Sequence, residues 1–174
     1  MEALPNNTYC LYCMVGREDE VVNSLTKAGY QALSPTVQKW KPVNGSLKKY
    51  PSRLLPGYVF FDAEPQQEPC WNYIRSLQPV IRVLQYSDGT RALKGADQEF
   101  SQWLKHCEGN IDVSQVVQVG TKIQFISGPL KEMSGLVVKV NKNRKQVAVN
   151  IGDNSIAKVV WCGIEYVEAD VQSS

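Results

Sequence analysis

Two cysteines near the start of the chain, Cys10 and Cys13, have the spacing of a metal-binding or redox pair. They lie in the continuous apolar run Tyr9–Val15, which is typical of a central strand. Residues three apart on a strand point to opposite faces, so the two sulfur atoms cannot share one ion. The sequence also has no second pair with this spacing. We therefore expect buried structural thiols and no metal site.

The only histidine, His106, is the remaining candidate for acid–base chemistry. It is predicted to lie on a helix beside Cys107, with Glu99 and Glu108 nearby in the sequence. A lone histidine on an amphipathic helix is most often solvated. The sequence contains no glycine-rich phosphate loop and no nucleophile elbow. We therefore predict that the chain is not an enzyme and uses no cofactor.

An aromatic strand is predicted at residues 58–61, directly after a Pro-Gly turn. Because side chains alternate along a strand, Tyr58 and Phe60 share one face, while Val59 and Phe61 share the other. A strand that is apolar on both faces has its second face covered either by a helix of the same domain or by a partner. The pattern alone leaves both possibilities open.

The segment before this strand has a segregated charge. Six basic residues and no acidic ones lie between Glu20 and Asp62, although the whole chain is nearly balanced at 19 basic and 17 acidic residues. Within the segment, Lys39–Arg53 contains the turn signal Asn44-Gly45 and predicts a basic hairpin or long loop. A charge run is most often a solvated face. One without acids that ends in an aromatic strand favours an acidic partner, either protein or nucleic acid.

The length and composition allow one ordinary domain or two small ones. Of the 174 residues, 43% are hydrophobic and 21% are charged, as in soluble globular proteins. No apolar run approaches the roughly 20 residues of a membrane span. The N-terminus lacks the features of a signal peptide. We expect a cytoplasmic protein without a membrane partner, whose five cysteines stay reduced.

The first hundred residues alternate strands with helices. The predicted order is strand 9–15, helix 18–28, strand 30–37 with a break at Ser34-Pro35, strand 58–61, helix 71–77, strand 80–86 and helix 100–107. One sheet with three helices packed on it makes an α/β sandwich.

The last part of the chain has a different pattern. Turns, one of them at Gly152–Asn154, separate four short strands that show no helical spacing, at 122–126, 136–140, 146–151 and 157–161. They predict a small antiparallel β-barrel. The periodicity fades before them. We therefore predict an α+β chain with a first domain at 1–108, a linker at 109–119 and a barrel domain at 120–174.

The sequence Pro-Gly-Tyr-Val-Phe at 56–60 resembles the signature strand of the NusG family of transcription elongation factors. That family also begins with an aromatic-rich strand and an acidic helix, as this chain does from Tyr9. Its C-terminal KOW domain opens with a Gly, then Gly-Pro, then a small residue and Gly. The matching residues here are Gly120, Gly128-Pro129 and Ser134-Gly135. The resemblance extends from Tyr9 to about Glu168.

The resemblance implies that the first domain, called NGN in this family, presents an aromatic pocket to two coiled helices of the RNA polymerase clamp. In specialised members of the RfaH type, the aromatics correspond by motif position to Tyr12, Tyr58 and Phe60. The basic hairpin would then lie near polymerase or the nucleic acid at the upstream fork. RfaH-type members make a second polymerase contact through a polar motif before the second helix, which residues 67–71 do not match.

The KOW domain of housekeeping members binds a termination factor or a small-subunit ribosomal protein, with aromatics after the Gly-Pro. This sequence has Leu130 and Met133 there instead, and a methionine can fill a hydrophobic socket. The barrel also carries the basic turn residues Lys142, Arg144 and Lys145. Such a turn suits an RNA backbone, or is simply solvated.

We interpret the chain as a specialised, monomeric NusG paralogue of the antiterminator kind represented by LoaP or RfaH. It would bind the clamp helices, suppress pausing or termination on selected operons, and be recruited by a nascent RNA hairpin or, alternatively, by non-template DNA. The residues expected to contact nucleic acid, with Trp40 stacking on bases, are Lys39, Trp40, Lys41, Lys48, Lys49, Arg53, Lys142, Arg144 and Lys145. The alternative is a free-standing RNA-binding or ribosome-associated β-barrel protein whose first domain dimerises.

Overall fold

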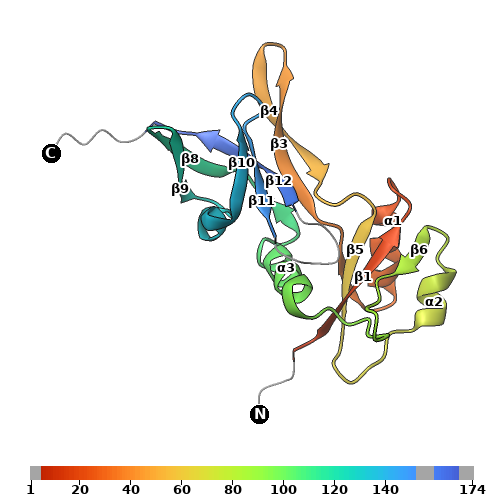
Figure 1. The fold of residues 1–174 in the computed structure, drawn as a ribbon. Coiled ribbons are helices and arrows are strands. Elements are labelled where there is room, and N and C mark those ends of the chain that lie inside the picture. Colours follow the sequence, from red (N-terminus) through yellow and green to blue (C-terminus); the bar gives the residue numbers. More distant parts are fainter. Residues whose placement is uncertain (1–4, 152–158, 169–174) are drawn as a thin grey trace. The chain divides into compact units, whose positions relative to one another are not determined.

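The computed structural model describes residues 5–151 and 159–168, and its contacts divide the chain into two compact units (Figure 1). The first unit contains the chain up to Pro35 together with Leu55–Gly109. The second contains Thr36–Leu54 together with the chain from Asn110 onward. The fold is mixed α+β, as the sequence predicts. Among the described residues, no helix is both long and apolar enough to cross a bilayer.

The first unit is built on a four-stranded sheet in which every pairing is antiparallel. In spatial order its strands are β2 (Gln31–Leu33), β5 (Tyr58–Ala63), β1 (Asn7–Cys13) and β6 (Val80–Val83). The predicted break at Ser34-Pro35 is confirmed, because β2 ends just before it and the next strand begins just after it.

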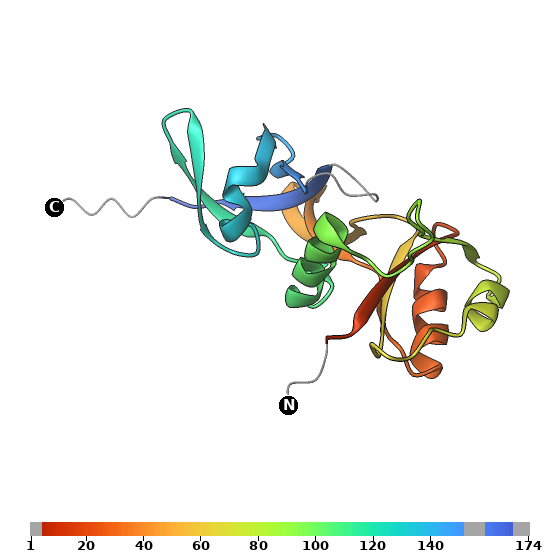
Figure 2. The same ribbon diagram turned by 60° about the horizontal axis from the view of Figure 1, so that its bottom comes forward.

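Helices lie on both faces of this sheet (Figure 2). Helices α1 (Glu18–Lys27) and α2 (Trp71–Ser76) pack on one face, where Tyr9 and Phe61 stack with their ring centroids 5.3 Å apart. Helix α3 (Gly95–His106) packs on the other face. The predicted sheet with three helices is therefore confirmed.

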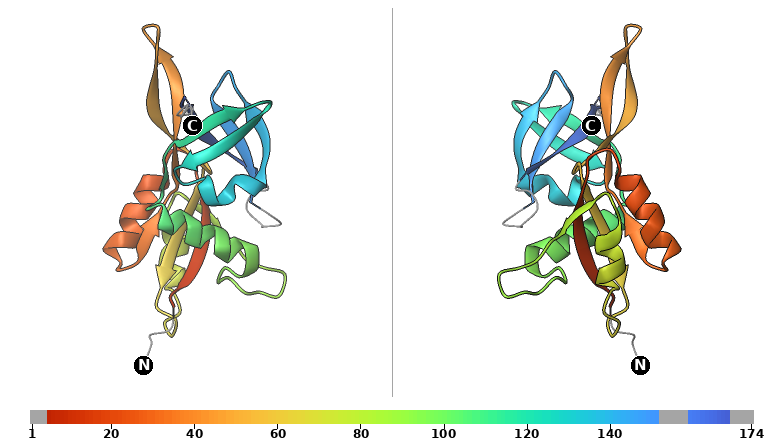
Figure 3. Two further views of the ribbon diagram at one scale, coloured as in Figure 1. Left: turned by 90° about the vertical axis from the view of Figure 1, so that its left-hand side faces the viewer. Right: turned by 90° about the vertical axis from the view of Figure 1, so that its right-hand side faces the viewer.

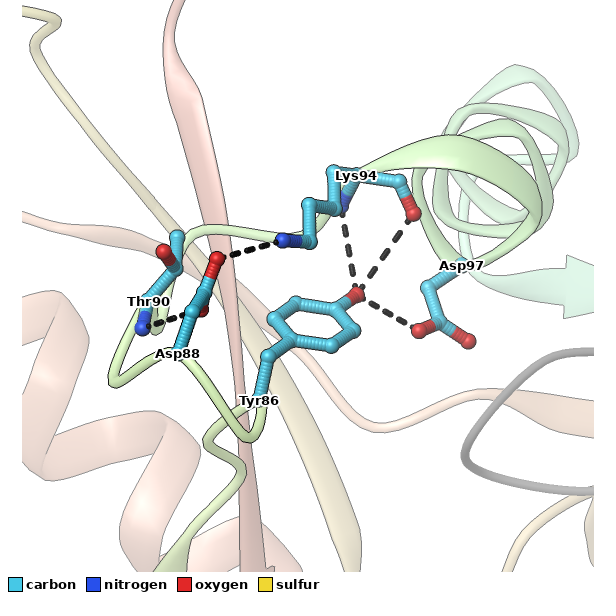
Figure 4. A network of polar contacts seen from close by, with 5 residues as sticks. All are labelled: Tyr86, Asp88, Thr90, Lys94 and Asp97. Carbon is cyan, nitrogen blue, oxygen red and sulfur yellow. Dashed lines mark hydrogen bonds and ion pairs between the residues drawn. The ribbon is translucent and has the colours of Figure 1, made fainter.

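A polar network fixes the loop between β6 and α3 (Figure 4). The Tyr86 hydroxyl donates a hydrogen bond of 2.5 Å to Asp97, whose side chain is buried. Lys94 forms an ion pair of 3.0 Å with Asp88, and its ammonium lies 4.7 Å from the centroid of the Tyr86 ring. Burial, together with the hydrogen bond to Asp97, raises the pKa of Tyr86 to about 12.

Replacing Tyr86→Phe should lower the free energy of unfolding of the first unit by about 2 kcal/mol, because the buried Asp97 carboxylate loses a donor. The Tyr86 contribution is present below the ordinary tyrosine pKa near 10 and is lost as the pH rises through about 12. The wild type should therefore lose its advantage over the variant between these pH values. Urea unfolding at pH 7 and pH 11.5 measures this, with Tyr73→Phe on exposed α2 surface as the control.

The second unit joins a hairpin to a curled sheet. The hairpin consists of β3 (Thr36–Val43) and β4 (Ser46–Arg53), and β7 (Asn110–Ile111) adds to it in parallel. The predicted hairpin with a turn at Asn44-Gly45 is confirmed, and both turn residues have positive φ, at 49° and 81°.

The curled sheet has five strands and forms a half-barrel (Figure 3). In spatial order its strands are β10 (Val137–Asn141), β11 (Gln146–Asn150), β12 (Val159–Tyr166), β8 (Ser114–Val119) and β9 (Lys122–Ser127), and a 3₁₀ helix, η1 (Lys131–Leu136), precedes β10. Three pairings are antiparallel, but β12 and β8 run parallel. The predicted turn at Gly152–Asn154 lies outside the described residues.

The segment 109–119, which we expected to be a linker, contains β7 and β8. Strand β8 pairs with both β12 and β9, and its Val116 and Val117 are buried in the half-barrel. The hairpin, which we expected in the first domain, belongs to the second unit. Both differences have one cause: Thr36 and Val37 pair with Asn110 and Ile111, which are far away in the sequence.

Candidate functional site

Two tyrosines lie side by side on the α3-facing side of the first unit's sheet. Tyr12 of β1 is directly opposite Tyr58 of β5, and their ring centroids are 5.2 Å apart. Both side chains are only partly buried. The pair therefore presents an aromatic surface.

Phe60 is not part of that exposed surface, although the sequence placed it there. Its side chain is only 2% exposed, because Phe100 of α3 packs edge-on against it with the ring centroids 6.4 Å apart. Phe60 also lines a pocket of about 320 Å³ together with Leu33 and Lys105. The second face of the aromatic strand is thus covered by a helix at Phe60 and left open at Tyr58.

Gly57 and Glu18 position the aromatic pair. Gly57 has φ 90°, and a Cβ placed there would lie 2.9 Å from both the Cys13 carbonyl oxygen and a ring carbon of Tyr12. The Gly57 carbonyl accepts a hydrogen bond of 2.6 Å from the Cys13 amide. The buried Glu18 carboxylate accepts from the amides of Gly16 and Gly57, which ties the start of α1 to the turn before β5.

Arg82 extends the aromatic surface, and sequence reasoning missed it. It lies opposite Tyr12 on β6, with its guanidinium carbon 5.3 Å from the centroid of the Tyr12 ring. The sequence did contain a signal for this residue, because a charged side chain interrupts the otherwise apolar strand Val80–Val83. Its meaning depended on which strand pairs with β1, and a local pattern does not show that.

The hairpin has two different faces. The cross-strand register places Lys41 opposite Lys48 and Lys39 opposite Tyr50, so these four side chains share one face. Among the residues that the structure describes, no ion pair joins these three lysines to a carboxylate. Like charges directly opposite each other destabilise a ladder, which favours an anionic partner for this face. We call these four residues the lysine face.

The other face of the hairpin packs on the half-barrel. The Trp40 indole donates a hydrogen bond of 2.7 Å to the Ile164 carbonyl oxygen, and the Lys145 ammonium lies 6.0 Å from the Trp40 ring centroid. Lys49, directly opposite Trp40, forms an ion pair of 3.2 Å with Asp112. Trp40, Lys49 and Lys145, which we expected to contact nucleic acid, therefore have structural partners within the protein.

The remaining predicted basic residues have mixed surroundings. Lys142 and Arg144 are exposed in the turn between β10 and β11, where Asn141 accepts a hydrogen bond from the Arg144 amide. Arg53 at the end of β4 is half-buried. Of this group, the two turn residues are the ones that a ligand could reach without a rearrangement.

The two residues expected to bind a partner of the KOW domain differ in exposure. Leu130 is completely buried, and its amide donates a hydrogen bond of 3.0 Å to the buried Ser114 hydroxyl oxygen. This side chain is part of the half-barrel core, so a partner would reach Leu130 only after a rearrangement. Met133, in η1, is partly exposed.

The two spaced cysteines lie on opposite faces of β1, as expected. Cys13 belongs to the core cluster under α1, whereas Cys10 lies opposite Phe60 on the other face. Burial raises the pKa of Cys13 to about 12 and that of Cys10 well above its ordinary value. Within residues 5–151 and 159–168, no cluster of histidine, cysteine and acidic side chains could hold a metal ion.

Charge divides sharply between the two units. The sequence ranges of the first unit contain seven basic and eleven acidic residues, and those of the second contain twelve and six. The nearly neutral chain thus consists of an acidic unit with an aromatic surface and a basic unit with a lysine face. A polyanion is attracted to the second unit and repelled by the first.

Comparisons with known proteins agree with this architecture. The family described as transcription termination factor NusG matches residues 7–103, more than half of the chain. The transcription termination/antitermination protein NusG of Pseudomonas aeruginosa is 28% identical over 159 residues, which cover 82% of this chain and 88% of that protein. A solved structure described as the domain interaction in Thermotoga maritima NusG shares the fold, with a TM-score of 0.51 and 20% identity over 93% of this chain and 96% of that one. The chain therefore belongs to the NusG family of transcription elongation and termination factors.

Proposed function

We propose that this protein binds the RNA polymerase clamp through the Tyr12–Tyr58 pair and suppresses pausing or termination on selected operons, without catalysing a reaction. The observation that carries the proposal is the partly exposed aromatic pair formed by Tyr58, on the strand with the Pro-Gly-Tyr-Val-Phe sequence, and Tyr12, on the neighbouring strand β1. Paired aromatic side chains supply large apolar area together with hydroxyl groups that stay hydrated, which suits a protein interface. The two coiled helices of the clamp are the expected partner, from the family resemblance.

Replacing Tyr58→Ala or Tyr12→Ala should weaken binding to the isolated clamp helices at least about tenfold, because truncating a central aromatic at an interface costs about 2 kcal/mol or more. Tyr73→Ala, which removes an exposed ring from α2 of the same unit, is the matched control and should bind like the wild type. Isothermal titration calorimetry gives the affinities, and circular dichroism checks the fold.

Phe60→Ala is unsuitable for this test, since it would open a cavity beneath α3. Unchanged affinity in both tyrosine variants would place the binding site elsewhere. A homodimer that Tyr58→Ala converts to monomers, seen by analytical ultracentrifugation, would instead support the dimerising alternative.

We further propose that the lysine face recruits the protein to a nascent RNA hairpin. Trp40 is engaged with Ile164 and Lys145, so it does not supply a ring for an unpaired base. On the lysine face itself the only aromatic ring is Tyr50, and the Lys41 ammonium lies 5.2 Å from its centroid. A row of lysines with little stacking surface suits the phosphates of a paired stem better than a splayed single strand.

The double variant Lys41→Glu with Lys48→Glu should lower the affinity for leader RNA about a hundredfold at low salt, and the salt dependence should become shallower. Lys122→Glu with Lys131→Glu changes the same charge on exposed residues of the same unit outside the hairpin, and should have a smaller effect. Gel shifts with leader RNA and with the matching non-template DNA strand separate the two possible recruiting elements. Binding to neither would refute recruitment through nucleic acid.

A further inference from the structure

The aromatic surface continues into a hollow beside β6. The hollow measures about 400 Å³ and is lined by Arg75, at the end of α2, and by the four residues Val80–Val83. Arg82 belongs to both features, because its guanidinium also lies over the Tyr12 ring. The hollow therefore borders the Tyr12–Tyr58 pair through Arg82, at the edge of the sheet.

The sheet is irregular where the hollow lies. Tyr12 pairs with Arg82, but the next residue, Cys13, pairs with Val80, so Ile81 is left without a partner in the ladder. Such a bulge bends a strand and redirects its side chains, and bulges are frequent beside functional sites. Here the bulged residue Ile81 is 59% exposed, next to Arg82, which keeps its regular pairing opposite Tyr12.

The lining of the hollow defines the chemistry of what it can receive. Two arginines and three aliphatic residues line it, and among the described residues no ion pair joins either arginine to a carboxylate. The planar guanidinium fork matches a carboxylate through two parallel hydrogen bonds. The group that fits is an aspartate or glutamate side chain with apolar neighbours.

A protein fits this hollow better than a nucleic acid. The first unit has more acidic than basic residues, which repels a polyanion. None of the five residues that line the hollow is an aromatic residue on which a base could stack. We propose that the hollow receives an acidic side chain of the same protein partner that covers the Tyr12–Tyr58 pair, and that Arg82 and Arg75 hold its carboxylate. This inference rests on the proposed binding of the polymerase clamp.

The test measures binding of the full chain to the isolated clamp helices. Arg82→Gln should weaken binding about tenfold and flatten its dependence on salt, since a charge-assisted hydrogen bond and one ion pair are lost. Arg75→Gln should weaken binding less than Arg82→Gln does. The affinity of Arg82→Lys should lie between those of the wild type and Arg82→Gln, because lysine keeps the charge but cannot form two parallel hydrogen bonds with a carboxylate. Lys27→Gln removes one exposed positive charge from α1 of the same unit and should stay within about twofold of wild type.

A double-mutant cycle then identifies the partner group. Each acidic residue of the clamp helices is changed to its amide, and one such change should lower affinity as much as Arg82→Gln while adding nothing in the Arg82→Gln background. If Arg82→Gln binds like wild type while Tyr58→Ala binds weakly, the hollow is not occupied but the clamp proposal stands. If the wild type does not bind the clamp helices, both proposals fall. If Arg82→Gln lowers RNA or DNA affinity and leaves clamp binding unchanged, the occupant is nucleic acid and the inference is wrong.

Discussion

Replacing Gly57→Ala should abolish the aromatic surface even though the substitution adds a single methyl group. A Cβ at this position would lie 2.9 Å from the backbone oxygen of Cys13 and from the Tyr12 ring, closer than any ordinary contact. The backbone of Gly57 also has φ 90°, which costs a non-glycine residue on the order of 1–3 kcal/mol. Strain and clash act together. We expect the first unit to lose about 4 kcal/mol of stability and clamp affinity to fall by more than tenfold.

Gly29→Ala is the matched control for backbone strain alone. Gly29 directly follows the C-cap of α1 with φ 98°, and nothing lies within 4 Å of a Cβ built there. The free energy of unfolding of this variant should be about 1 kcal/mol lower than that of the wild type, and its affinity for the clamp helices should be unchanged. Hydrogen exchange of the β1 and β5 amides reports the local stability of the sheet in both variants. If Gly57→Ala were as stable and as active as Gly29→Ala, the close packing of the turn against Tyr12 would not matter.

Local patterns predicted the elements of the first unit well. Alternation assigned the correct face to residues 58–61, because a strand has a fixed period of two. The same period did not reveal that α3 covers Phe60 and leaves Tyr58 open. That difference depends on where α3, some forty residues later in the sequence, packs on the sheet. Such tertiary packing is not visible in a local sequence pattern. Phe60, which we expected to contact polymerase, is therefore a core residue in the structure.

The hairpin shows a second limit of sequence reasoning. Its turn was visible in Asn44-Gly45, but its place in the second unit depends on pairing with residues more than seventy positions away. Strand pairing also decides which lysines are available to a ligand. Lys41 and Lys49 lie on different strands, so alternation within each strand does not show that they point to opposite faces of the hairpin. In the half-barrel, the Gly-Pro motif located the right loop but not the burial of Leu130, since the burial comes from packing across the curled sheet.

Packing of the hairpin on the half-barrel should depend on Gly163. This residue of β12 has no room for a side chain, because a Cβ built there would lie 2.5 Å from the backbone oxygen of Gln38 in β3. Its φ is not in the left-handed region, so the effect of a substitution is steric. Gly163→Ala should push β3 away from β12 and break the hydrogen bond from the Trp40 indole to the Ile164 carbonyl oxygen. The free energy of unfolding of the second unit should fall by about 3 kcal/mol.

The indole N–H signal of Trp40 in nuclear magnetic resonance spectra measures this displacement. In Gly163→Ala it should move and exchange faster with solvent, and leader RNA should bind more weakly although no charge has changed. Gly135→Ala is the control in the same unit, since nothing lies within 4 Å of a Cβ built there. Its free energy of unfolding should stay within about 0.5 kcal/mol of the wild-type value. Trp40→Phe removes the hydrogen bond without the clash and should cost about 1–2 kcal/mol. A Gly163→Ala variant with an unchanged Trp40 signal and unchanged RNA affinity would show that the half-barrel does not position the lysine face.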